Sequence, residues 1–449
     1  MAPRRRTVLA AVSTATASAA AGCFELLAND SNDESDAKTA TDVANAFVDD
    51  LAKQRFERAS ERFVERERGK YGAPARLERL WMGFTAVAGA FDGIEGTSKT
   101  TRNGVVVIDA TLTFENGAHT CRIVVDDSQR LLNCGIADQY DRPSYVDPSG
   151  FTERDLRLEV DGCSLEGTVT TPANGTGSGG GAPGVVLVHD SGPSTRDTAQ
   201  GGTKLFVDLA EGLATRGVAT LRYDKRVPAC EVEAGSYTLD RVTVDDALVA
   251  VEKLRGIEGV DADGIVVAGH GLGGTAAPRI ATRDGNLAGI AGLAAPARPY
   301  HELTLEQLEH KVSVGSHEWG DLANVYEQWT AEIDRIRDDE YESSDVLLGK
   351  PGAFWESLAA YDHLQTARDV DVPLRLVQGK RDFQVTVADD LQRWRTELEG
   401  RSKTTVETYD GLNHLFMPVE GPSVEFAYAV RNNVAERVVD DLAGWIGEL

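Results

Sequence analysis

Cysteine and lysine are scarce in this chain, and acidic residues far outnumber basic ones. Five cysteines occur among 449 residues, and they form neither a Cys-x-x-Cys pair nor a group with histidine. This spacing does not indicate a zinc site, so we expect no metal and no other cofactor. Only 11 of the 46 basic residues are lysine, against 72 acidic residues. A chain of net charge -26 lacks the basic surface that binds nucleic acids, and we expect no nucleic-acid partner.

The excess of acidic residues is typical of proteins that stay dissolved in concentrated salt. In concentrated salt, surface charges are screened over short distances. An acidic, lysine-poor surface stays hydrated under these conditions. The composition therefore favours a halophilic source. An acidic protein from an ordinary environment is the alternative that the composition leaves open.

The first 22 residues are typical of a targeting segment rather than of a folded element. Arg5 and Arg6 precede a short apolar run, which resembles a twin-arginine signal. The run is too short to span a bilayer and ends in Ala-Ala-Gly-Cys, which resembles a lipobox with Cys23 as the lipid-bearing residue. We expect an exported protein, lipid-anchored to the outer face of the cytoplasmic membrane, with residues 23–40 as a disordered acidic tether. A cleaved signal with a chance cysteine is the alternative.

The four remaining cysteines are candidates for disulfides, because an exported protein meets oxidising conditions. Cys121 and Cys134 lie on neighbouring strand-like runs and could meet across a hairpin. Cys163 and Cys230 lie further along the chain and form the other pair that we consider.

The segment 41–140 is predicted to form a first domain. Apolar residues recur at helical spacing over 41–82, and strand-like runs follow between residues 105 and 132, with the turn sequence Glu-Asn-Gly at 115–117. Helices followed by an antiparallel meander predict an α+β fold. This order resembles the NTF2-like domain, which implies a pocket for a ligand. A spacer or a dimerisation unit is the alternative.

From residue 150 to 449 strand-like runs alternate with helical ones, which predicts an α/β domain with a mostly parallel sheet. A glycine-rich loop at 174–181 separates two of the strands. Residues 299–360 interrupt the alternation and are helical, charged and rich in tryptophan (Trp319, Trp329 and Trp355), which predicts a helical cap over a pocket. The predicted strands are 156–160, 165–170, 184–188, 219–223, 264–268, 287–293, 374–378 and 403–409.

Four short motifs each follow one of these strands. The pentapeptide Gly-His-Gly-Leu-Gly is centred on Gly271, and the tetrapeptide Gly-Lys-Arg-Asp ends at Asp382. The tetrapeptide Gly-Leu-Asn-His ends at His414, and His-Asp-Ser-Gly-Pro occupies 189–193.

In their order and spacing the motifs resemble those of the α/β-hydrolase family, in its esterase, dienelactone-hydrolase and serine-aminopeptidase-like branch. The resemblance implies a doubly wound, mostly parallel sheet with a helical cap, and a catalytic nucleophile, acid and histidine in that chain order. On this resemblance Gly271 occupies the position of the nucleophile, Asp382 that of the acid and His414 that of the base.

Two positions depart from the family pattern. The family has Gly-x-Ser-x-Gly at the first motif, and here Gly271 replaces the serine, so no acyl-enzyme is expected to form. The family has His-Gly-x-Gly-Pro at its oxyanion hole, and here Asp190 replaces the first glycine. The backbone near Ser191 and that of Leu272 would form this hole, and a carboxylate beside it would repel negative charge. The alternative is that Asp190 points to solvent.

Three hypotheses of function remain at this point. The first is a catalytically impaired homologue that binds a small acyl, ester or peptide-like ligand at the cell surface. The second is a working hydrolase in which His414, held by Asp382, activates water in the space that the missing serine leaves. The third is an interaction protein that works through its NTF2-like domain. Ser191 and Thr275 carry the nearest hydroxyl groups, and neither is expected to replace the nucleophile.

Overall fold

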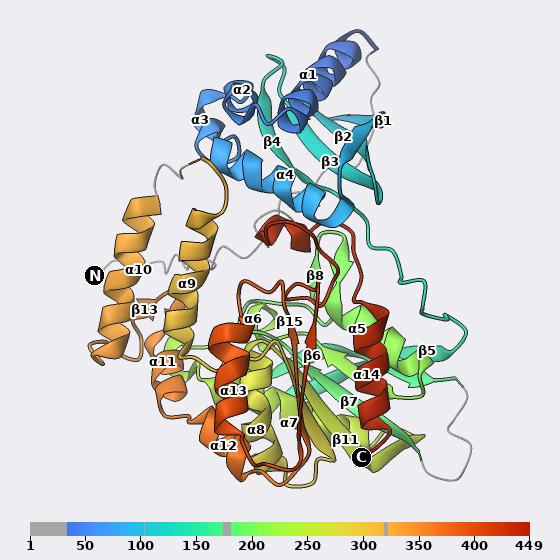
Figure 1. The fold of residues 1–449 in the computed structure, drawn as a ribbon, viewed down its shortest axis with the longest axis vertical. Coiled ribbons are helices and arrows are strands. Elements are labelled where there is room, and N and C mark those ends of the chain that lie inside the picture. The colour runs from blue at the N-terminus through green and yellow to red at the C-terminus, as the bar shows by residue number, and fades with distance from the viewer. Residues whose placement is uncertain (1–33, 103, 174–180, 318–321) are drawn as a thin grey trace, which may run out of the picture.

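The computed structural model describes most of the chain beyond the predicted signal (Figure 1). The described residues are 34–102, 104–173, 181–317 and 322–449. The predicted signal at 1–22, Cys23, most of the glycine-rich loop and Trp319 lie outside them. Among the helices formed by the described residues, none has both the length and the hydropathy needed to cross a membrane.

The N-terminal domain consists of four helices followed by a four-stranded antiparallel sheet in the order β1-β2-β3-β4. In β2 most residues alternate between buried and half-buried, as expected for a strand with one face on a core. The predicted turn at 115–117 joins β2 to β3. The elements are α1 Glu34–Ala52, α2 Phe56–Glu61, α3 Glu65–Arg68, α4 Pro74–Ala88, β1 Phe91–Arg102, β2 Val105–Phe114, β3 Gly117–Val125 and β4 Leu131–Ile136.

Two features of this domain differ from the sequence expectations. Helix α1 begins at Glu34, so residues 34–40 are helical rather than part of a disordered tether. That stretch contains alanine, lysine and glutamate, which have high helix propensity, so a polar composition alone does not make it disordered. Strand β1 is largely exposed and was not predicted, because its backbone pairs with β2 while its sequence shows no apolar alternation.

The second domain is an eight-stranded sheet in the order β16-β15-β12-β11-β7-β10-β6-β5. The six strands from β16 to β10 are parallel to their neighbours, and β6 and β5 are antiparallel additions at one edge. All eight predicted strands are present: β5 Phe151–Val160, β6 Cys163–Pro172, β7 Ala182–Val188, β10 Ala219–Tyr223, β11 Val260–His270, β12 Gly289–Leu293, β15 Leu374–Gly379 and β16 Thr404–Tyr409.

Helices cover both faces of this sheet, as the doubly wound prediction requires. In β7, Val186 and Val188 face the core that α7 and α8 close, whereas Val185 and Leu187 face the core that α5 and α14 close. The helices are α5 Leu205–Thr215, α6 Arg226–Ala229, α7 Asp245–Arg255, α8 Leu272–Asp284, α12 His363–Asp369, α13 Gln392–Glu397 and α14 Glu436–Ile446.

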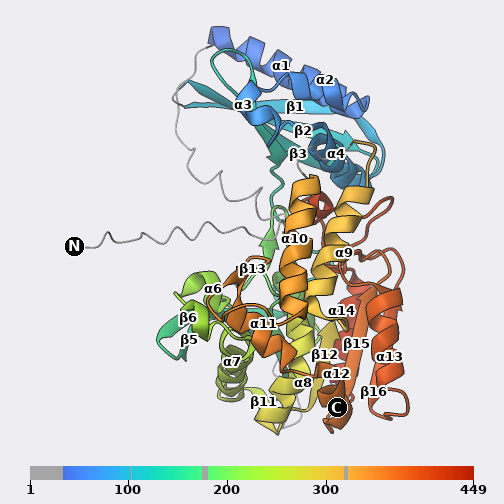
Figure 2. The same ribbon diagram turned by 90° about the vertical axis from the view of Figure 1, so that its left-hand side faces the viewer.

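The segment 299–360, predicted as a cap, forms helices beside the carboxyl edge of the sheet. Both ribbon views show α9 and α10 side by side, extending toward the N-terminal domain (Figures 1 and 2). The elements are α9 Tyr300–Ser313, α10 Leu322–Arg337, β13 Val346–Leu347, β14 Lys350–Pro351 and α11 Gly352–Ala359.

The N-terminal domain packs against the chain segment that follows His414. In this segment the short helix η5 (Glu425–Tyr428) contributes Phe426 to the core of the N-terminal domain. Arg79 of α4 forms a buried ion pair with Glu425, and the backbone N–H of Arg431 donates to Asp138 at 2.8 Å. The N-terminal domain therefore supports one wall of the region in which His414 lies.

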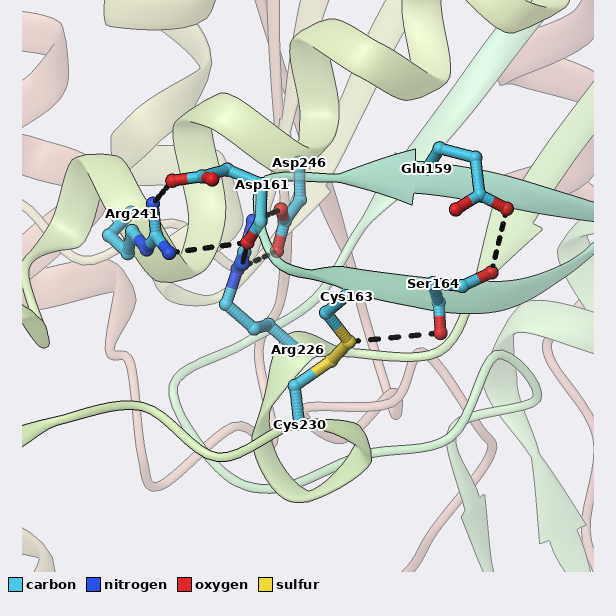
Figure 3. Close-up of a disulfide and its surroundings, with 8 residues drawn as sticks. All are labelled: Glu159, Asp161, Cys163, Ser164, Arg226, Cys230, Arg241 and Asp246. Atoms are coloured by element: carbon cyan, nitrogen blue, oxygen red, sulfur yellow. Dashed lines mark hydrogen bonds and ion pairs between the residues drawn. A yellow bond between two sulfur atoms is a disulfide. The ribbon is translucent and has the colours of Figure 1, made fainter.

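One of the two considered disulfides is present. Cys163 at the start of β6 is bonded to Cys230, which directly follows α6 (Figure 3). Cys121 and Cys134 are buried and free, so the prediction that they pair is wrong. They do lie on neighbouring strands, but the register places Cys121 opposite Ile136 and Cys134 opposite Ile123.

Reduction of the Cys163–Cys230 bond is expected to lower the free energy of unfolding by about 2–5 kcal/mol, because it frees a loop of 67 residues in the unfolded chain. Urea unfolding with and without dithiothreitol measures the change. The double variant Cys163→Ser, Cys230→Ser is the control and should not respond to dithiothreitol. An unchanged midpoint for the wild-type chain under reduction would contradict the assignment.

Candidate active site

The first motif forms the sharp turn that its glycines predict. Strand β11 ends at His270, and α8 begins at Leu272, with Gly271 between them at φ 53° and ψ -122°. A Cβ atom on Gly269 would lie 2.1 Å from the backbone oxygen of Gly273, so the flanking positions leave no room for side chains. A residue other than glycine at 271 would be strained in this conformation by about 1–3 kcal/mol.

The carboxylate of Asp190 fills the space beside Gly271. An ideal Cβ atom on Gly271 would lie 2.3 Å from both Cγ and Oδ1 of Asp190. Oδ1 accepts hydrogen bonds from the backbone N–H of Ser191 at 2.7 Å and from that of Leu272 at 2.8 Å. These are the groups predicted to form the oxyanion hole. The carboxylate points into the site, although 35% of the Asp190 side chain remains exposed, so solvent still reaches it.

Asp382 and His414 meet as predicted. Nδ1 of His414 lies 2.7 Å from Oδ2 of Asp382. Oδ1 of Asp382 accepts hydrogen bonds from the backbone N–H groups of Gln384 at 2.7 Å and Val385 at 3.0 Å. The acid is thus fixed by its own loop, and it fixes the orientation of the imidazole.

The other ring nitrogen of His414 faces Asp190. Nε2 of His414 lies 3.7 Å from Oδ2 of Asp190, which is ion-pair distance but longer than a hydrogen bond. Burial opposes the charged form of His414, but the carboxylates of Asp382 and Asp190 outweigh it and raise the pKa of His414 to about 10. Burial also opposes the charge of Asp190, yet the neighbouring His414 and His270 hold the pKa of that carboxyl below its usual range.

His270 belongs to the same cluster, which the sequence interpretation missed. Its Nε2 contacts the backbone oxygen of His414 at 3.0 Å, which is a packing contact of the turn. Its Nδ1, however, is buried and has no hydrogen-bond partner among the described residues. Burial and the charge of His414 lower the pKa of His270 to about 4, so this imidazole is neutral near neutral pH. The signal that could have found it is its place at the carboxyl end of β11, the sheet edge that Asp190 and His414 share.

One donor atom each of Asp190, His270 and His414 lies within 4.8 Å of the other two. The spacing of histidines and cysteines does not predict such a group, because these three residues are far apart in the chain. The fold brings these three side chains together at one edge of the sheet.

Two lysines hold the loop that carries Asp190. Lys225 donates to the backbone oxygen of Asp190, and Lys350 of β14 donates to that of Ser191 at 2.7 Å. Burial and the charge of Lys350 lower the pKa of Lys225 to about 7. The segment 299–360 therefore reaches the predicted oxyanion loop directly.

The two hydroxyl groups nearest to the turn are engaged elsewhere. Oγ of Ser191 pairs with the hydroxyl of Tyr300 of α9, and Oγ1 of Thr275 donates to the backbone oxygen of Pro296 at 3.0 Å. Nε2 of His414 has no hydrogen-bond partner among the described residues, so neither hydroxyl is bonded to it. The expectation that neither replaces the nucleophile agrees with these contacts.

Comparison with known proteins matches both parts of the chain. A family model described as a protein of unknown function (DUF3887) matches residues 44–133 and is compatible with the predicted NTF2-like domain. Esterase EstD of Thermotoga maritima is 31% identical over 404 residues, which are 89% of this chain and 93% of that protein. The chain belongs to the α/β-hydrolase esterase family.

Solved structures of other esterases resemble this family member more distantly. Brefeldin A esterase, a bacterial homologue of human hormone-sensitive lipase, is 18% identical with a TM-score of 0.41, over 70% of this chain and 81% of that one. An esterase of Pyrococcus furiosus is 16% identical with a TM-score of 0.43, over 69% of this chain and 97% of that one.

In this esterase-family chain, Gly271→Ala is expected to cost more than about 3 kcal/mol of unfolding free energy, because it adds backbone strain and displaces a hydrogen-bonded carboxylate. In an Asp190→Gly background only the strain remains, and the cost should fall to about 1–3 kcal/mol. Urea unfolding of the four proteins measures both costs.

Gly285→Ala is the matched control, since Gly285 ends α8 at φ 76° with no atom within 4 Å of its would-be Cβ. Its cost should be the same in both backgrounds. Equal costs of Gly271→Ala in the two backgrounds would show that Asp190 does not fill this space.

Proposed function

We propose that this α/β-hydrolase homologue binds an ester or peptide-like ligand without forming an acyl-enzyme. The observation that carries the proposal is the position of the Asp190 carboxylate. It lies where a side chain at 271 would begin, and it accepts hydrogen bonds from the backbone N–H groups of Ser191 and Leu272. Membership of the esterase family supports the class of ligand.

Acyl transfer by this family needs two things at the turn between β11 and α8. It needs a hydroxyl oxygen to attack the carbonyl carbon, and it needs free N–H groups to receive the negative charge that then develops. Gly271 supplies no hydroxyl, and the N–H groups of Ser191 and Leu272 already hold an anion. A substrate carbonyl would have to displace a charged group from these donors before it could react.

The same observation argues against the second hypothesis, in which His414 activates water. That mechanism needs a water molecule in the space that the missing serine leaves. In this chain the Asp190 carboxylate fills that space, 3.7 Å from Nε2 of His414. The arrangement supports ligand binding over general-base hydrolysis.

Export is part of the same proposal. The twin-arginine pattern, the lipobox at Cys23 and the disulfide between Cys163 and Cys230 are all consistent with a protein outside the cytoplasm. The proposal fails on this point if the chain with Cys23→Ala stays in the membrane fraction as completely as the wild-type chain does.

Four proteins test the central part of the proposal: the wild-type chain, Gly271→Ser, Asp190→Gly and the double variant. All are dialysed against a chelator and assayed on p-nitrophenyl esters in molar salt. The double variant restores both family motifs and should exceed the wild-type rate by at least about 10³-fold, since a triad nucleophile is worth more than that. Each single variant should stay near the wild-type rate, because one lacks the hydroxyl and the other keeps the carboxylate.

A fluorophosphonate probe should label the double variant covalently and leave the wild-type chain unlabelled. The wild-type chain should instead gain thermal stability from esters or their carboxylic acid products. Ester hydrolysis by the wild-type chain that His414→Ala abolishes would overturn the proposal, and so would the absence of stabilisation by any member of the panel.

A further inference from the structure

We propose that Asp190, His270 and His414 form a binding site for a divalent transition-metal ion of the zinc class. The inference goes beyond the proposed function, which concerns the loss of serine chemistry. It rests on how the three side chains are held and on which of their atoms remain free.

The three donor atoms have nearly the spacing that a metal ion requires. They lie within 4.8 Å of one another, and Oδ2 of Asp190 is 3.7 Å from Nε2 of His414. Ligand atoms about 2.0–2.1 Å from a tetrahedral ion are roughly 3.3 Å apart. Side-chain movements of about 1 Å or less would therefore bring all three into coordination.

Each of the two imidazoles has a buried nitrogen without a hydrogen-bond partner among the described residues. These nitrogens are Nδ1 of His270 and Nε2 of His414, and the two residues are only 2% and 3% exposed. A buried polar atom without a partner costs about 1–3 kcal/mol. A metal ion bound to Nδ1 of His270 and Nε2 of His414 would give both atoms a partner, whereas the surrounding side chains give them none.

In each of the three side chains, the polar atom that would not bind the ion is held by another group of the protein. Nε2 of His270 contacts the backbone oxygen of His414, and Nδ1 of His414 contacts Asp382. Oδ1 of Asp190 is held by two backbone N–H groups, which leaves Oδ2 for another partner. Ligands of metal ions are typically oriented in this way, with histidine held from behind by a carboxylate or a backbone carbonyl.

The set of donors indicates the class of ion. Two imidazoles and one carboxylate match zinc and its neighbours, whereas calcium and magnesium prefer oxygen donors throughout. Three protein ligands leave a coordination position open to water or to an anionic oxygen of a ligand. The partial exposure of Asp190 gives the ion and such a ligand a way in.

The surrounding charges are compatible with this assignment. Two carboxylates, those of Asp190 and Asp382, flank His414, and their negative charges would offset the positive charge of a bound ion. Lys225 approaches the backbone oxygen of Asp190 rather than its carboxylate.

The test uses the whole chain after dialysis against a chelator, titrated with Zn²⁺ by calorimetry and with Co²⁺ by visible absorption. One ion per chain should bind, Co²⁺ should show the intense visible bands of tetrahedral coordination, and the melting temperature should rise with metal concentration. Asp190→Asn and His270→Gln should each weaken binding by at least about 100-fold. Asp382→Asn, which acts only through His414, should weaken it by about 10- to 100-fold.

His317→Ala is the matched control. His317 contacts Glu78 and lies 3.9 Å from Glu57, so it is the place where an adventitious ion would find a histidine beside two carboxylates. Its removal should leave the affinity unchanged. Circular dichroism without metal checks that each variant folds.

Three results would overturn the proposal: fewer than one ion per chain, binding that survives both Asp190→Asn and His270→Gln, or binding that His317→Ala abolishes. None of these depends on catalysis, and the ester assays above are made without metal. A failure of the metal site is therefore distinguishable from a failure of the proposed function.

Discussion

The carboxylate of Asp190 lies under the backbone N–H groups of Ser191 and Leu272, at a turn where Gly271 has no side chain. The rest of the site depends on this contact. Because the N–H groups hold a fixed anion, His414 has a carboxylate on each side instead of a carboxylate and a hydroxyl. The residues at 190 and 271 are therefore physically coupled, since the side chain of one uses the space that the other leaves empty.

Distant parts of the chain hold this contact in place. Two of the 11 lysines, Lys225 and Lys350, are buried against the backbone of the loop that carries Asp190. Lys350 comes from the segment 299–360, so the helical insertion supports the loop as well as lying beside the sheet edge. On the other side, the N-terminal domain packs on the segment that follows His414, through the ion pair of Arg79 with Glu425. Both domains thus determine the shape of a site formed by one of them.

Much of the fold could be predicted because its signals are local. The eight strands of the second sheet, the turn at Gly271, and the order of Asp382 and His414 all follow from short runs of sequence. Strand β1 could not be predicted, since it is held by pairing with β2 and carries no apolar pattern. The free state of Cys121 and Cys134 depends on a strand register that differs by two residues from the one a disulfide would need.

The candidate site could be predicted only in part, for a similar reason. Motifs identified Gly271, Asp190 and His414 one at a time, and left open whether Asp190 points inward. That direction depends on the space beside Gly271, which no single motif describes. The place of His270 in this cluster could not be predicted, because it depends on a residue 144 positions away. Nε2 of His270 contacts the backbone oxygen of His414, and only the folded structure shows that Nδ1 has no partner among the described residues.

A crystal structure of the wild-type chain, grown without metal, is the most direct test of the central claim. We expect electron density for the Asp190 carboxylate within hydrogen-bonding distance of both backbone nitrogens, close to the 2.7 and 2.8 Å described above. Density that shows the carboxylate turned toward solvent, with water bound to the N–H groups of Ser191 and Leu272, would contradict it.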